Sequence, residues 1–597
     1  MEVQNSFQIV WDKTPYRSFT DYFFAKIGAH GSNLAIVDVD TGKQWRYSEI
    51  RGWCDMCAMR LKELQVTINS RVAVITGTTG QAIFVHLACS LIGCSAVAVN
   101  GWNTVDEIWQ LVDLSESTHL IVEPQFQQKA DDVRRKAVMR GGGRIKHVRV
   151  IDDVLTSESI SSEENGLEED SEAPSHMLTP VNTSNAINPM LIFFTSGTTG
   201  LPKVSYYDLF TYNNFNAAEL AHRSLIINIQ QMSLPLYGPV QAKERFLLAL
   251  SISHIFGAVS AYYALVNGAI VHMMSKVFPR VLIETLTKTN INVSHITPAM
   301  LMWLARDPAL DDVKMPNLRS LIVGGAPVDC NLANLAKQKM NLKDMRQTYG
   351  MTELGGLCTL SHYEYDNIES VGSPLPGMLF KVVNWETKQL CGPRQPGQLM
   401  VIGPQVMPSY FKNPKATNEL LDSNGYIKTG DAAFYDENGH LYVLDRIKDI
   451  IKYKGTLVCP SEVELILRAH PGIDDCAVVG RQDHVAGEVP AAFVVKSSSH
   501  PLLASAEVRQ YVSGKIATFK ELRGGVFFIS EIPRSVCGKV SRRQLRQFWD
   551  RERNNSKVEG PPKDAKQSKE NKTPTVKTNG LSHTPTKKTP LSRTTKK

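Results

Sequence analysis

A short segment rich in hydroxyl groups and glycines follows four apolar residues in the first half of the chain. The apolar run is Leu191-Ile-Phe-Phe194, and Thr195-Ser-Gly-Thr-Thr-Gly200 comes directly after it. Glycines let the backbone turn tightly, so that its N–H groups come within hydrogen-bonding distance of phosphate oxygens, and hydroxyls add donors. Lys203 adds a positive charge, although the Gly-Lys-Ser/Thr ending of a Walker A loop is absent. The pattern predicts a phosphate-binding loop after a buried strand.

Five further motifs place glycines, hydroxyls or charged side chains in short segments. They are Gly324-Gly-Ala-Pro327 after the apolar run Leu321-Ile-Val323, Gln347-Thr-Tyr-Gly-Met-Thr-Glu353, Tyr426-Ile-Lys-Thr-Gly-Asp431, Asp445-Arg-Ile-Lys-Asp449 with Ile450-Ile-Lys-Tyr-Lys-Gly455, and Pro533-Arg-Ser-Val-Cys-Gly-Lys539. In type and order, the six motifs resemble those of the adenylate-forming superfamily. That superfamily includes acyl- and aryl-CoA synthetases, beetle luciferases and the adenylation domains of peptide synthetases. The resemblance covers residues 20–550 and is nearest to the 4-coumarate–CoA ligase and luciferase branch.

The resemblance implies an ATP-dependent acid–thiol ligase. Such an enzyme converts a carboxylic acid to acyl-AMP with release of pyrophosphate, and then forms a thioester with coenzyme A. ATP, Mg²⁺ and coenzyme A are therefore the expected cofactor and co-substrates. Attack of one anion on another requires electrostatic stabilisation. Lys539 is expected to supply it near the α-phosphate, Thr352 and Glu353 to hold Mg²⁺ and phosphate oxygens, and Asp431 and Arg446 to bind the ribose.

The same resemblance implies the rest of the nucleotide site and a hinge. The residues expected to contact ATP or AMP, besides Asp431 and Arg446, are Thr195, Ser196, Gly197, Thr198, Thr199, Gly200, Lys203, Gly324, Gly325, Ala326, Pro327, Gln347, Thr348, Tyr349 and Gly350. The C-terminal domain is expected to swing about Lys448, which removes Lys539 from the site. Lys452, Lys454 and the Gly455 backbone would then flank pantetheine and the phosphates of coenzyme A.

His254 lies in a long stretch without charged residues. A lone histidine in such a stretch is more often a core residue, but the CoA ligases of the family have a similar His-x-x-Gly at the acyl pocket. The resemblance therefore implies a catalytic role for His254. No acidic residue lies between Phe246 and Ser275, so the ammonium of an amino-acid substrate would lack a partner there. A fatty or aryl acid with an uncharged tail is the predicted substrate.

The elements that must position these residues alternate along the chain between apolar strands and helical stretches. This alternation predicts an α/β fold with parallel sheets and covering helices. The charged, turn-rich segment at Asp445–Asp449 predicts a boundary. We expect an acid- and ATP-binding domain at 1–445, with a flexible acidic insertion at 156–185. A mobile, small α+β domain at 446–552 and a disordered basic tail at 553–597 are expected to follow.

Charge is concentrated in the tail. Residues 551–597 contain 13 basic and 4 acidic residues, whereas the whole chain has a net charge of +7. The tail is expected to contact acidic membrane surfaces peripherally; nucleic acid is a less favoured partner. The ten cysteines suggest neither a zinc site nor a disulfide framework, which fits a reducing compartment. The first twenty residues do not resemble a signal peptide, and the chain does not end in Ser-Lys-Leu, so a cytoplasmic, non-peroxisomal location is expected.

Two stretches without charged residues, 72–105 and 246–275, have the length that a membrane span requires. Glycines and polar residues interrupt both, whereas a spanning helix needs about 20 mostly apolar residues. The first fits a strand at 72–76, a helix at 81–91 and a strand at 95–99, and the second fits the same pattern. No transmembrane span is expected.

The motifs leave the acceptor open. A luciferase-like oxygenase and an enzyme that loads a carrier protein share them, and a non-catalytic scaffold with this fold is a further alternative. Retention of Lys203, Glu353, Asp431, Arg446 and Lys539 together argues against the scaffold. No carrier domain with a modifiable serine follows Lys539, which argues against carrier loading. The pattern favours the CoA ligase, without fixing the length or aromaticity of the acid.

Overall fold

The two long uncharged stretches fold as strand–helix–strand units, which confirms the prediction. The first forms β4 (Arg71–Thr76), α3 (Gly80–Ile92) and β5 (Ser95–Asn100), and the second forms β10 (Arg245–Leu248), α7 (Ile255–Val266) and β11 (Ile270–Met273). Every residue of β5 is buried, as expected of a central parallel strand. Helix α3 ends where Gly93 adopts φ 86°, a left-handed conformation that favours glycine. Among the described residues, no helix is long and apolar enough to cross a membrane.

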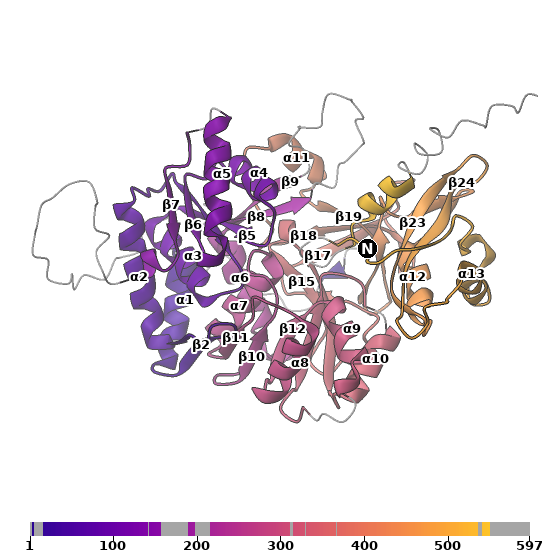
Figure 1. The fold of residues 1–597 in the computed structure, drawn as a ribbon, viewed down its shortest axis with the longest axis horizontal. Coiled ribbons are helices and arrows are strands. Elements are labelled where there is room, and N and C mark those ends of the chain that lie inside the picture. The colour runs from indigo at the N-terminus through magenta and orange to yellow at the C-terminus, as the bar shows by residue number, and fades with distance from the viewer. Residues whose placement is uncertain are drawn as a thin grey trace, which may run out of the picture. The chain divides into compact units, whose positions relative to one another are not determined.

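The structure is a computed structural model that describes residues 3–4, 16–140, 143–156, 189–196, 215–310, 315–328, 330–365, 367–534 and 540–549. The predicted insertion, apart from Thr156, and the basic tail lie outside these ranges. The described residues up to Gln547 belong to one unit. Their strands form four sheets, which Figure 1 shows with the intervening helices.

One sheet has six strands, of which all but the last run parallel. In spatial order they are β7 (His147–Val150), β6 (His119–Val122), β4, β5, β8 (Pro189–Ser196) and β9 (Phe215–Ala221). Strand β8 begins two residues before the predicted apolar run and includes it. Its last residues, Thr195 and Ser196, begin the predicted phosphate-binding loop.

The second sheet has nine strands and a parallel centre. In spatial order they are β16 (Ser373–Pro374), β15 (Gly356–Leu360), β14 (Asp344–Met351), β13 (Ser320–Gly324), β12 (Val293–Ile296), β10, β11, β2 (Leu34–Asp38) and β3 (Gln44–Arg46). The carboxyl ends of β13 and β14 meet where Gly324 pairs with Thr348. In parallel sheets of this kind, ligands bind at the carboxyl ends of the strands.

Helices lie between these two sheets. Helix α3 contacts β4, β5 and β8 of the first sheet and β2 of the second, and α6 (His222–Met232) contacts β9 and β15. The other helices are α1 (Phe19–Ile27), α2 (Tyr47–Glu63), α4 (Val105–Leu114), α5 (Gln127–Met139), α8 (Pro279–Lys288), α9 (Pro298–Arg306), α10 (Cys330–Lys339) and α11 (Pro414–Leu420). One large hydrophobic core includes residues of α1, α3, α6 and α7 and of both sheets.

The third sheet is antiparallel and precedes the predicted hinge. Its strands, in spatial order, are β1 (Val3–Gln4), β17 (Leu379–Val383), β18 (Gly397–Ile402), β19 (Ile427–Tyr435) and β20 (Leu441–Arg446). Asp431 of β19 pairs with Arg446, the last residue of β20. The sheet thus places the predicted ribose-binding pair side by side.

The residues after Arg446 form a smaller, separate core. Its sheet contains β22 (Thr456–Val458), β21 (Ile451–Tyr453), β24 (Gly487–Lys496) and β23 (Ile473–Asp483) in spatial order, and β25 (Gly525–Phe528) pairs with β24. The helices are α12 (Pro460–Arg468) and α13 (Ser505–Ser513). The fold is therefore α/β with a large N-terminal domain and a smaller α+β C-terminal domain, as predicted. The boundary at 445/446 remains a prediction.

Candidate active site

The Gly324–Pro327 turn, which the resemblance predicts to contact ATP or AMP on the adenine side and which we term the adenine-side turn, follows β13. Gly324 ends the strand, and Gly325 adopts φ +93°, a conformation that favours glycine. A Cβ on Gly324 would lie 2.8 Å from Thr348 Cγ2 and 3.1 Å from the Phe256 ring, so a larger residue would displace one of them. Gly325, Ala326 and Pro327 are exposed. The turn is thus closely packed at Gly324, whereas its other three residues are exposed.

Tyr349, Asp431 and Arg446 form a chain of polar contacts between two sheets. The Tyr349 hydroxyl donates to Asp431 Oδ2 at 2.5 Å, and Arg446 Nε lies 2.8 Å from Oδ1 of the same carboxylate. Only 5% of Asp431 is exposed. Burial, and then the charge of Asp431, raises the pKa of Tyr349 well above its usual value, so the hydroxyl stays protonated. Each carboxylate oxygen can accept more than one hydrogen bond, so Asp431 retains capacity for ribose hydroxyls.

Glu353 is also buried, with 4% of its surface exposed, in the single helical turn η7 (Thr352–Leu354). The Tyr410 hydroxyl donates to Glu353 Oε1 at 2.7 Å, and the Met407 N–H donates to the Glu353 carbonyl at 3.1 Å. Within the described residues, Oε2 receives no hydrogen bond. Burial by itself would lower the pKa of Arg446. The nearby negative charges, with Asp431 first and Glu353 among the smaller ones, have the greater combined effect, so the pKa is raised. The cation and both carboxylates therefore belong to one electrostatic cluster.

The strands that hold these groups also fix Gln347, Thr348 and Gly350. Gln347 donates from Nε2 to the Ile368 carbonyl, and Thr348 donates from Oγ1 to the Thr359 carbonyl at 2.7 Å. A Cβ on Gly350 would lie 2.1 Å from the Gly356 carbonyl oxygen, so only glycine fits there. Thr348 and the Gln347 amide therefore stabilise the motif, while Tyr349 contributes the contact with Asp431.

Thr195 lies at the carboxyl end of β8, opposite Asn216 of β9. Its Oγ1 is buried and has no hydrogen bond within the part of the chain that the structure describes. Ser196 follows as the last residue of the strand. The remainder of the predicted loop, Gly197, Thr198, Thr199, Gly200 and Lys203, lies outside the described residues, as does Lys539. The buried, unpaired Thr195 hydroxyl suits a ligand oxygen.

His254 is the residue immediately before α7 and has extended backbone angles. Its carbonyl accepts from the Ala258 N–H at 2.9 Å, and its own N–H donates to the Ser251 carbonyl at 3.1 Å. A Cβ on Gly257 would lie 2.1 Å from that same Ser251 oxygen. Glycine is therefore required at position 257 for the close approach of the Ser251 carbonyl to α7. Phe256, two residues after His254, lies next to Gly324 of the adenine-side turn.

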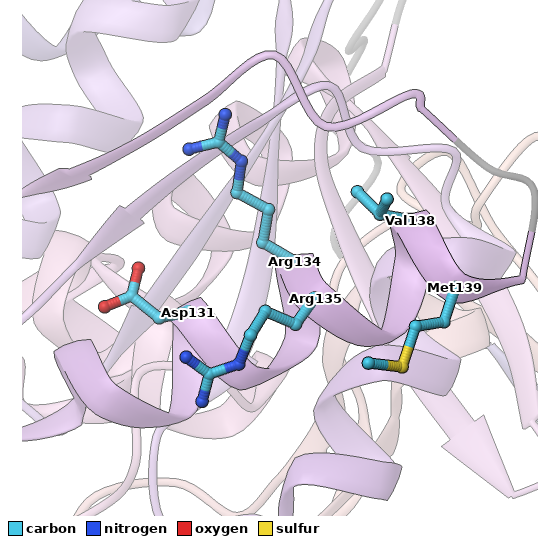
Figure 2. Close-up of a pocket in the computed structure, with 5 residues that line it drawn as sticks. All are labelled: Asp131, Arg134, Arg135, Val138 and Met139. Carbon is cyan, nitrogen blue, oxygen red and sulfur yellow. The ribbon is translucent and has the colours of Figure 1, made fainter.

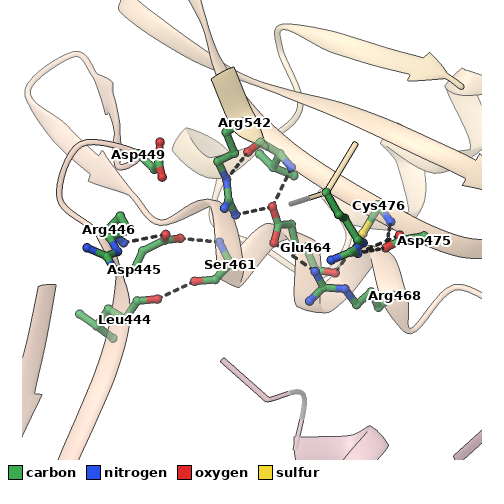
Figure 3. Close-up of polar contacts among 12 residues, drawn as sticks. Leu444, Asp445, Arg446, Asp449, Ser461, Glu464, Arg468, Asp475, Cys476 and Arg542 are labelled. Carbon is green, nitrogen blue, oxygen red and sulfur yellow. Dashed lines mark hydrogen bonds and ion pairs between the residues drawn. The ribbon is translucent and has the colours of Figure 1, made fainter. Parts of the chain in front are cut away.

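Figure 3 shows polar contacts across the predicted hinge. Asp445 Oδ2 accepts from the Ser461 N–H at 3.0 Å, and Ser461 Oγ donates to the Leu444 carbonyl at 2.8 Å. Because Ser461 is the second residue of α12, Asp445 caps that helix. Burial raises the pKa of Asp445, against the opposing effect of Arg542. Lys448, between Asp445 and Ser461, is exposed.

The predicted coenzyme A residues lie on β21 and on the turn between β21 and β22. Lys452 is exposed on β21, and Lys454 and Gly455 adopt φ 47° and 79° in the turn. The Lys454 backbone N–H donates to the Ala486 carbonyl at 2.8 Å. No contact between these residues and Tyr349, Glu353, Asp431 or Arg446 is present among the described residues. The structure thus joins Tyr349, Asp431 and Arg446 of the predicted ATP site by direct bonds, and within the described residues the predicted coenzyme A residues form no such bond with them.

A hollow on α5 is lined by Asp131, Arg134, Arg135, Val138 and Met139. Figure 2 shows the Arg134 and Arg135 side chains extending to opposite sides of the helix. Arg135 is ion-paired with Asp132. None of the predicted site residues lines this hollow, so it is not part of the candidate active site.

Sequence reasoning did not assign a role to Tyr410 or to the Asp445 cap. Tyr410 is 57 residues from its partner Glu353, and no local spacing links the two. Pro460 is favourable as the first residue of a helix, so the sequence does signal where α12 begins. It does not signal that Asp445, on the other side of the predicted hinge, caps this helix.

Comparison with known proteins agrees with this geometry. Residues 23–411 match the AMP-binding enzyme family, and residues 462–539 match the AMP-binding enzyme C-terminal domain. The chain is 27% identical to 4-coumarate–CoA ligase 3 of Arabidopsis thaliana over 88% of this chain and 90% of that protein. It is 28% identical to luciferin 4-monooxygenase of Photinus pyralis over 86% and 91%, respectively.

Solved structures share the fold at lower sequence identity. ATP-bound MatB from Rhodopseudomonas palustris superposes with a TM-score of 0.74 at 23% identity, covering 89% of this chain and 99% of that chain. The anthranilate CoA ligase AuaEII in complex with anthranoyl-AMP gives a TM-score of 0.77 at 18% identity, covering 90% and 99%. The AMP-binding enzyme family matches more than half of the length of this chain. The chain therefore belongs to the AMP-binding, adenylate-forming enzymes.

Proposed function

We propose that this protein is an AMP-forming acyl-CoA synthetase, which activates a fatty or aryl acid to acyl-AMP and transfers the acyl group to coenzyme A. The main support is the buried carboxylate of Asp431, which Tyr349 and Arg446 contact at 2.5 and 2.8 Å, together with the buried Glu353, whose charge acts on the same Arg446. Asp431 and Arg446 would bind the ribose, and Thr195 would meet a phosphate oxygen. Such fixed, buried dipoles and charges stabilise charge that develops during adenylation.

The donor set around Glu353 suits Mg²⁺. Mg²⁺ usually binds one or two carboxylates together with substrate phosphates, rather than a cage made only of protein groups. A buried carboxylate with one oxygen fixed by Tyr410 and the other without a hydrogen bond from the described residues fits that pattern. When bound, the ion would supply positive charge against the phosphates. Glu353 would hold it, and Thr352 would face the same oxygens.

The acid would lie near Phe256 and the adenine-side turn, with His254 beside its carboxylate. The chain between Phe246 and Ser275, which includes α7 and the loop before it, contains no Asp, Glu, Lys or Arg. This supports a fatty or aryl acid over an amino acid, and with it a place in lipid or aromatic-acid metabolism.

The second step would use a different face of the C-terminal domain. Lys539 would act in adenylation, and rotation about Lys448 would then present Lys452, Lys454 and the Gly455 backbone to coenzyme A. Exposure of the two lysines supports this assignment. For the basic tail at 553–597 we propose peripheral contact with acidic membrane in the cytoplasm, on the basis of its charge.

Two alternatives have specific support among the relatives. One relative is a luciferin 4-monooxygenase and another protein of the same fold is an amide bond synthetase. An adenylate-former that passes the acyl group to a different acceptor would have the same ATP-side residues. The alternatives therefore differ from our proposal only in the second step.

The experiment that separates these functions measures AMP release by the purified full chain across short, medium, long and aromatic acids, with and without coenzyme A. AMP release that requires both the acid and coenzyme A, with the thioester identified by mass, supports the proposal. Acid-dependent exchange of pyrophosphate into ATP without stimulation by coenzyme A would instead indicate another acceptor. Absence of exchange with every acid would contradict adenylation.

A substitution ties this activity to the site. Glu353→Gln should lower acid-dependent turnover by about 10²-fold or more, since a charged, metal-linked contact is lost. Glu369→Gln is the matched control, because Glu369 is exposed and lies in the loop before β16. Near wild-type turnover of Glu353→Gln at saturating Mg²⁺ would remove Glu353 from the site.

A further inference from the structure

Tyr410 connects two segments of the candidate active site that are distant in the sequence. Its side chain is buried, with 4% exposed, and its hydroxyl donates to Glu353 Oε1 at 2.7 Å. The same hydroxyl lies near the side chains of Thr195 and Asn216. Tyr410 therefore lies between the carboxylate of η7 and the end of β8, where the predicted phosphate-binding loop begins.

The backbone around Tyr410 is held to β9 on both sides. The Phe411 N–H donates to the Ala217 carbonyl at 2.7 Å, and the Ser409 carbonyl accepts from the Glu219 N–H at 3.0 Å. Tyr410 itself forms a bridge with Ala218. Because β9 pairs with β8, Tyr410 is connected through β9 to the strand that precedes the predicted phosphate-binding loop.

The same segment is held to Glu353 by a second bond. The Met407 N–H donates to the Glu353 carbonyl at 3.1 Å, so both the backbone and the side chain of Glu353 contact residues 407–410. The Tyr410 N–H donates to Thr417 Oγ1 at 3.0 Å, which fixes the segment to α11. Among the described residues, the Tyr410 hydroxyl is the group that bonds the Glu353 carboxylate, and this bond fixes its rotation.

We propose that Tyr410 is a positioning residue: it fixes the Glu353 carboxylate relative to Thr195, so that both groups meet Mg²⁺–nucleotide in a preformed arrangement. The inference rests on the proposed function for the identity of the ligand. Two buried polar features point to that ligand. Thr195 Oγ1 lacks a hydrogen bond within the described residues, and among them Glu353 is bonded through only one of its carboxylate oxygens.

The phenol hydroxyl is required, rather than the ring alone. Phenylalanine would keep the packing of the ring against its neighbours and remove the hydroxyl, with its bond to Glu353 Oε1 and its proximity to Thr195 and Asn216. Glu353 would then be a buried carboxylate with one fewer donor and a free terminal torsion, which is broad for glutamate. The bound nucleotide would have to restrict that torsion, and a hydrogen bond to a charged group would be lost.

Tyr410→Phe should therefore weaken binding of Mg²⁺ with the non-cleavable analogue AMPCPP by about 10-fold in titration calorimetry, since hydrogen bonds to charged groups are the stronger ones. Binding of adenosine, which has no phosphate, should change less than about twofold. Neither measurement needs an acid or coenzyme A. The matched control is Tyr435→Phe, because Tyr435 is 2% exposed and its hydroxyl donates to the Cys391 carbonyl at 3.0 Å, away from the site.

A double variant separates positioning from a general structural effect. In a background of Glu353→Gln, adding Tyr410→Phe should cost little further affinity, because the two residues act through one contact. Equal binding of Mg²⁺–AMPCPP by wild type and Tyr410→Phe overturns the inference alone. A matching loss of adenosine affinity also overturns it, since the effect is then not specific to the phosphate side. If the wild type binds no Mg²⁺–nucleotide, the proposed function fails together with the inference.

Discussion

The two parts of the molecule on either side of the predicted hinge hold their charged side chains in different ways. Before the hinge, Glu353 and Asp431 are 4% and 5% exposed and have fixed hydroxyl or guanidinium partners. After it, the predicted coenzyme A residues Lys452, on strand β21, and Lys454, in the turn that follows, are exposed. Groups proposed for the first half-reaction are thus preorganised, whereas those proposed for the second are presented to solvent.

Burial of charge also occurs after the hinge, but it serves folding. Glu464 is 3% exposed; its carboxylate contacts Arg542 at 2.6 Å and Arg468 at 3.2 Å and accepts from the Val478 N–H at 2.8 Å (Figure 3). This cluster joins α12, β23 and the residues after β25 into one unit. If the C-terminal domain rotates about Lys448 as proposed, this cluster would keep its elements together during the movement.

The largest expected effect comes from Lys539→Ala, which tests whether the two half-reactions are separate. Adenylation should fall by roughly 10³-fold, because a cation that acts mainly in the transition state is lost. Thioester formation from preformed acyl-AMP and coenzyme A should remain near the wild-type rate, since that step would use the other face. Single-turnover assays of each step provide the measurement. Equal loss of both steps would contradict the division of roles between the two faces.

Glu464→Gln should have the next largest effect, and on stability rather than on chemistry. Removing the Glu464 charge breaks its buried ion pairs with Arg542 and Arg468, at a cost of about 3 kcal/mol in the free energy of unfolding. Urea unfolding followed by a probe in the C-terminal domain would measure it. Glu462→Gln is the control: Glu462 pairs with Lys520 at an exposed position, where loss of the pair costs under about 1 kcal/mol. Similar losses in both variants would show that the Glu464 cluster does not hold the domain together.

Features that depend on residues close together in the sequence could be predicted from it, whereas contacts between distant residues could not. Strand–helix–strand units such as β4–α3–β5 were predictable, because apolar runs and glycine punctuation are local signals. Motif order also grouped Tyr349, Asp431 and Arg446, which the structure joins by direct contacts, whereas the nucleotide-binding roles of these and the other site residues remain predictions. The contacts of Glu353 with Tyr410 and of Asp445 with Ser461 were not predictable. They join residues 57 and 16 positions apart, and their formation depends on the packing of separate elements.

Acidification should distinguish the two parts through buried histidines before the hinge. Burial lowers the pKa of His86, His222 and His272 to about 4 and that of His295 to about 3. Such a group is neutral in the folded protein, so the stability it contributes is present above its unfolded pKa near 6.5 and decreases as the pH falls toward the folded value. The N-terminal part should therefore lose stability between pH 6.5 and pH 4.

His222→Asn tests this at one position. His222 Nδ1 accepts from the Phe19 N–H at 3.2 Å, and the asparagine oxygen can take the same bond without titrating. Between pH 7.5 and pH 5, wild type should lose about 2 kcal/mol more than the variant, from the difference between the folded and unfolded pKa values. Urea unfolding at both pH values measures the difference. His500→Asn, at an exposed position after the hinge, should match wild type at both. A parallel response of wild type and His222→Asn would refute the assignment of acid sensitivity to this histidine.

The smallest expected effect concerns Lys454, and it tests the exposed half of the comparison most directly. Lys454→Gln keeps the length of the side chain and removes its charge at a solvent-exposed turn. One exposed contact with a phosphate is worth under about 1 kcal/mol, so the KM for coenzyme A should rise about threefold while acid-dependent exchange of pyrophosphate into ATP stays unchanged. The increase should shrink as salt rises, because exposed charges are screened. Arg509→Gln, an exposed charge on α13 of the same domain, should leave both values unchanged. If Lys454→Gln lowered pyrophosphate exchange instead, Lys454 would act in the first step, and the contrast between a buried adenylation site and an exposed thiol-binding face would no longer hold.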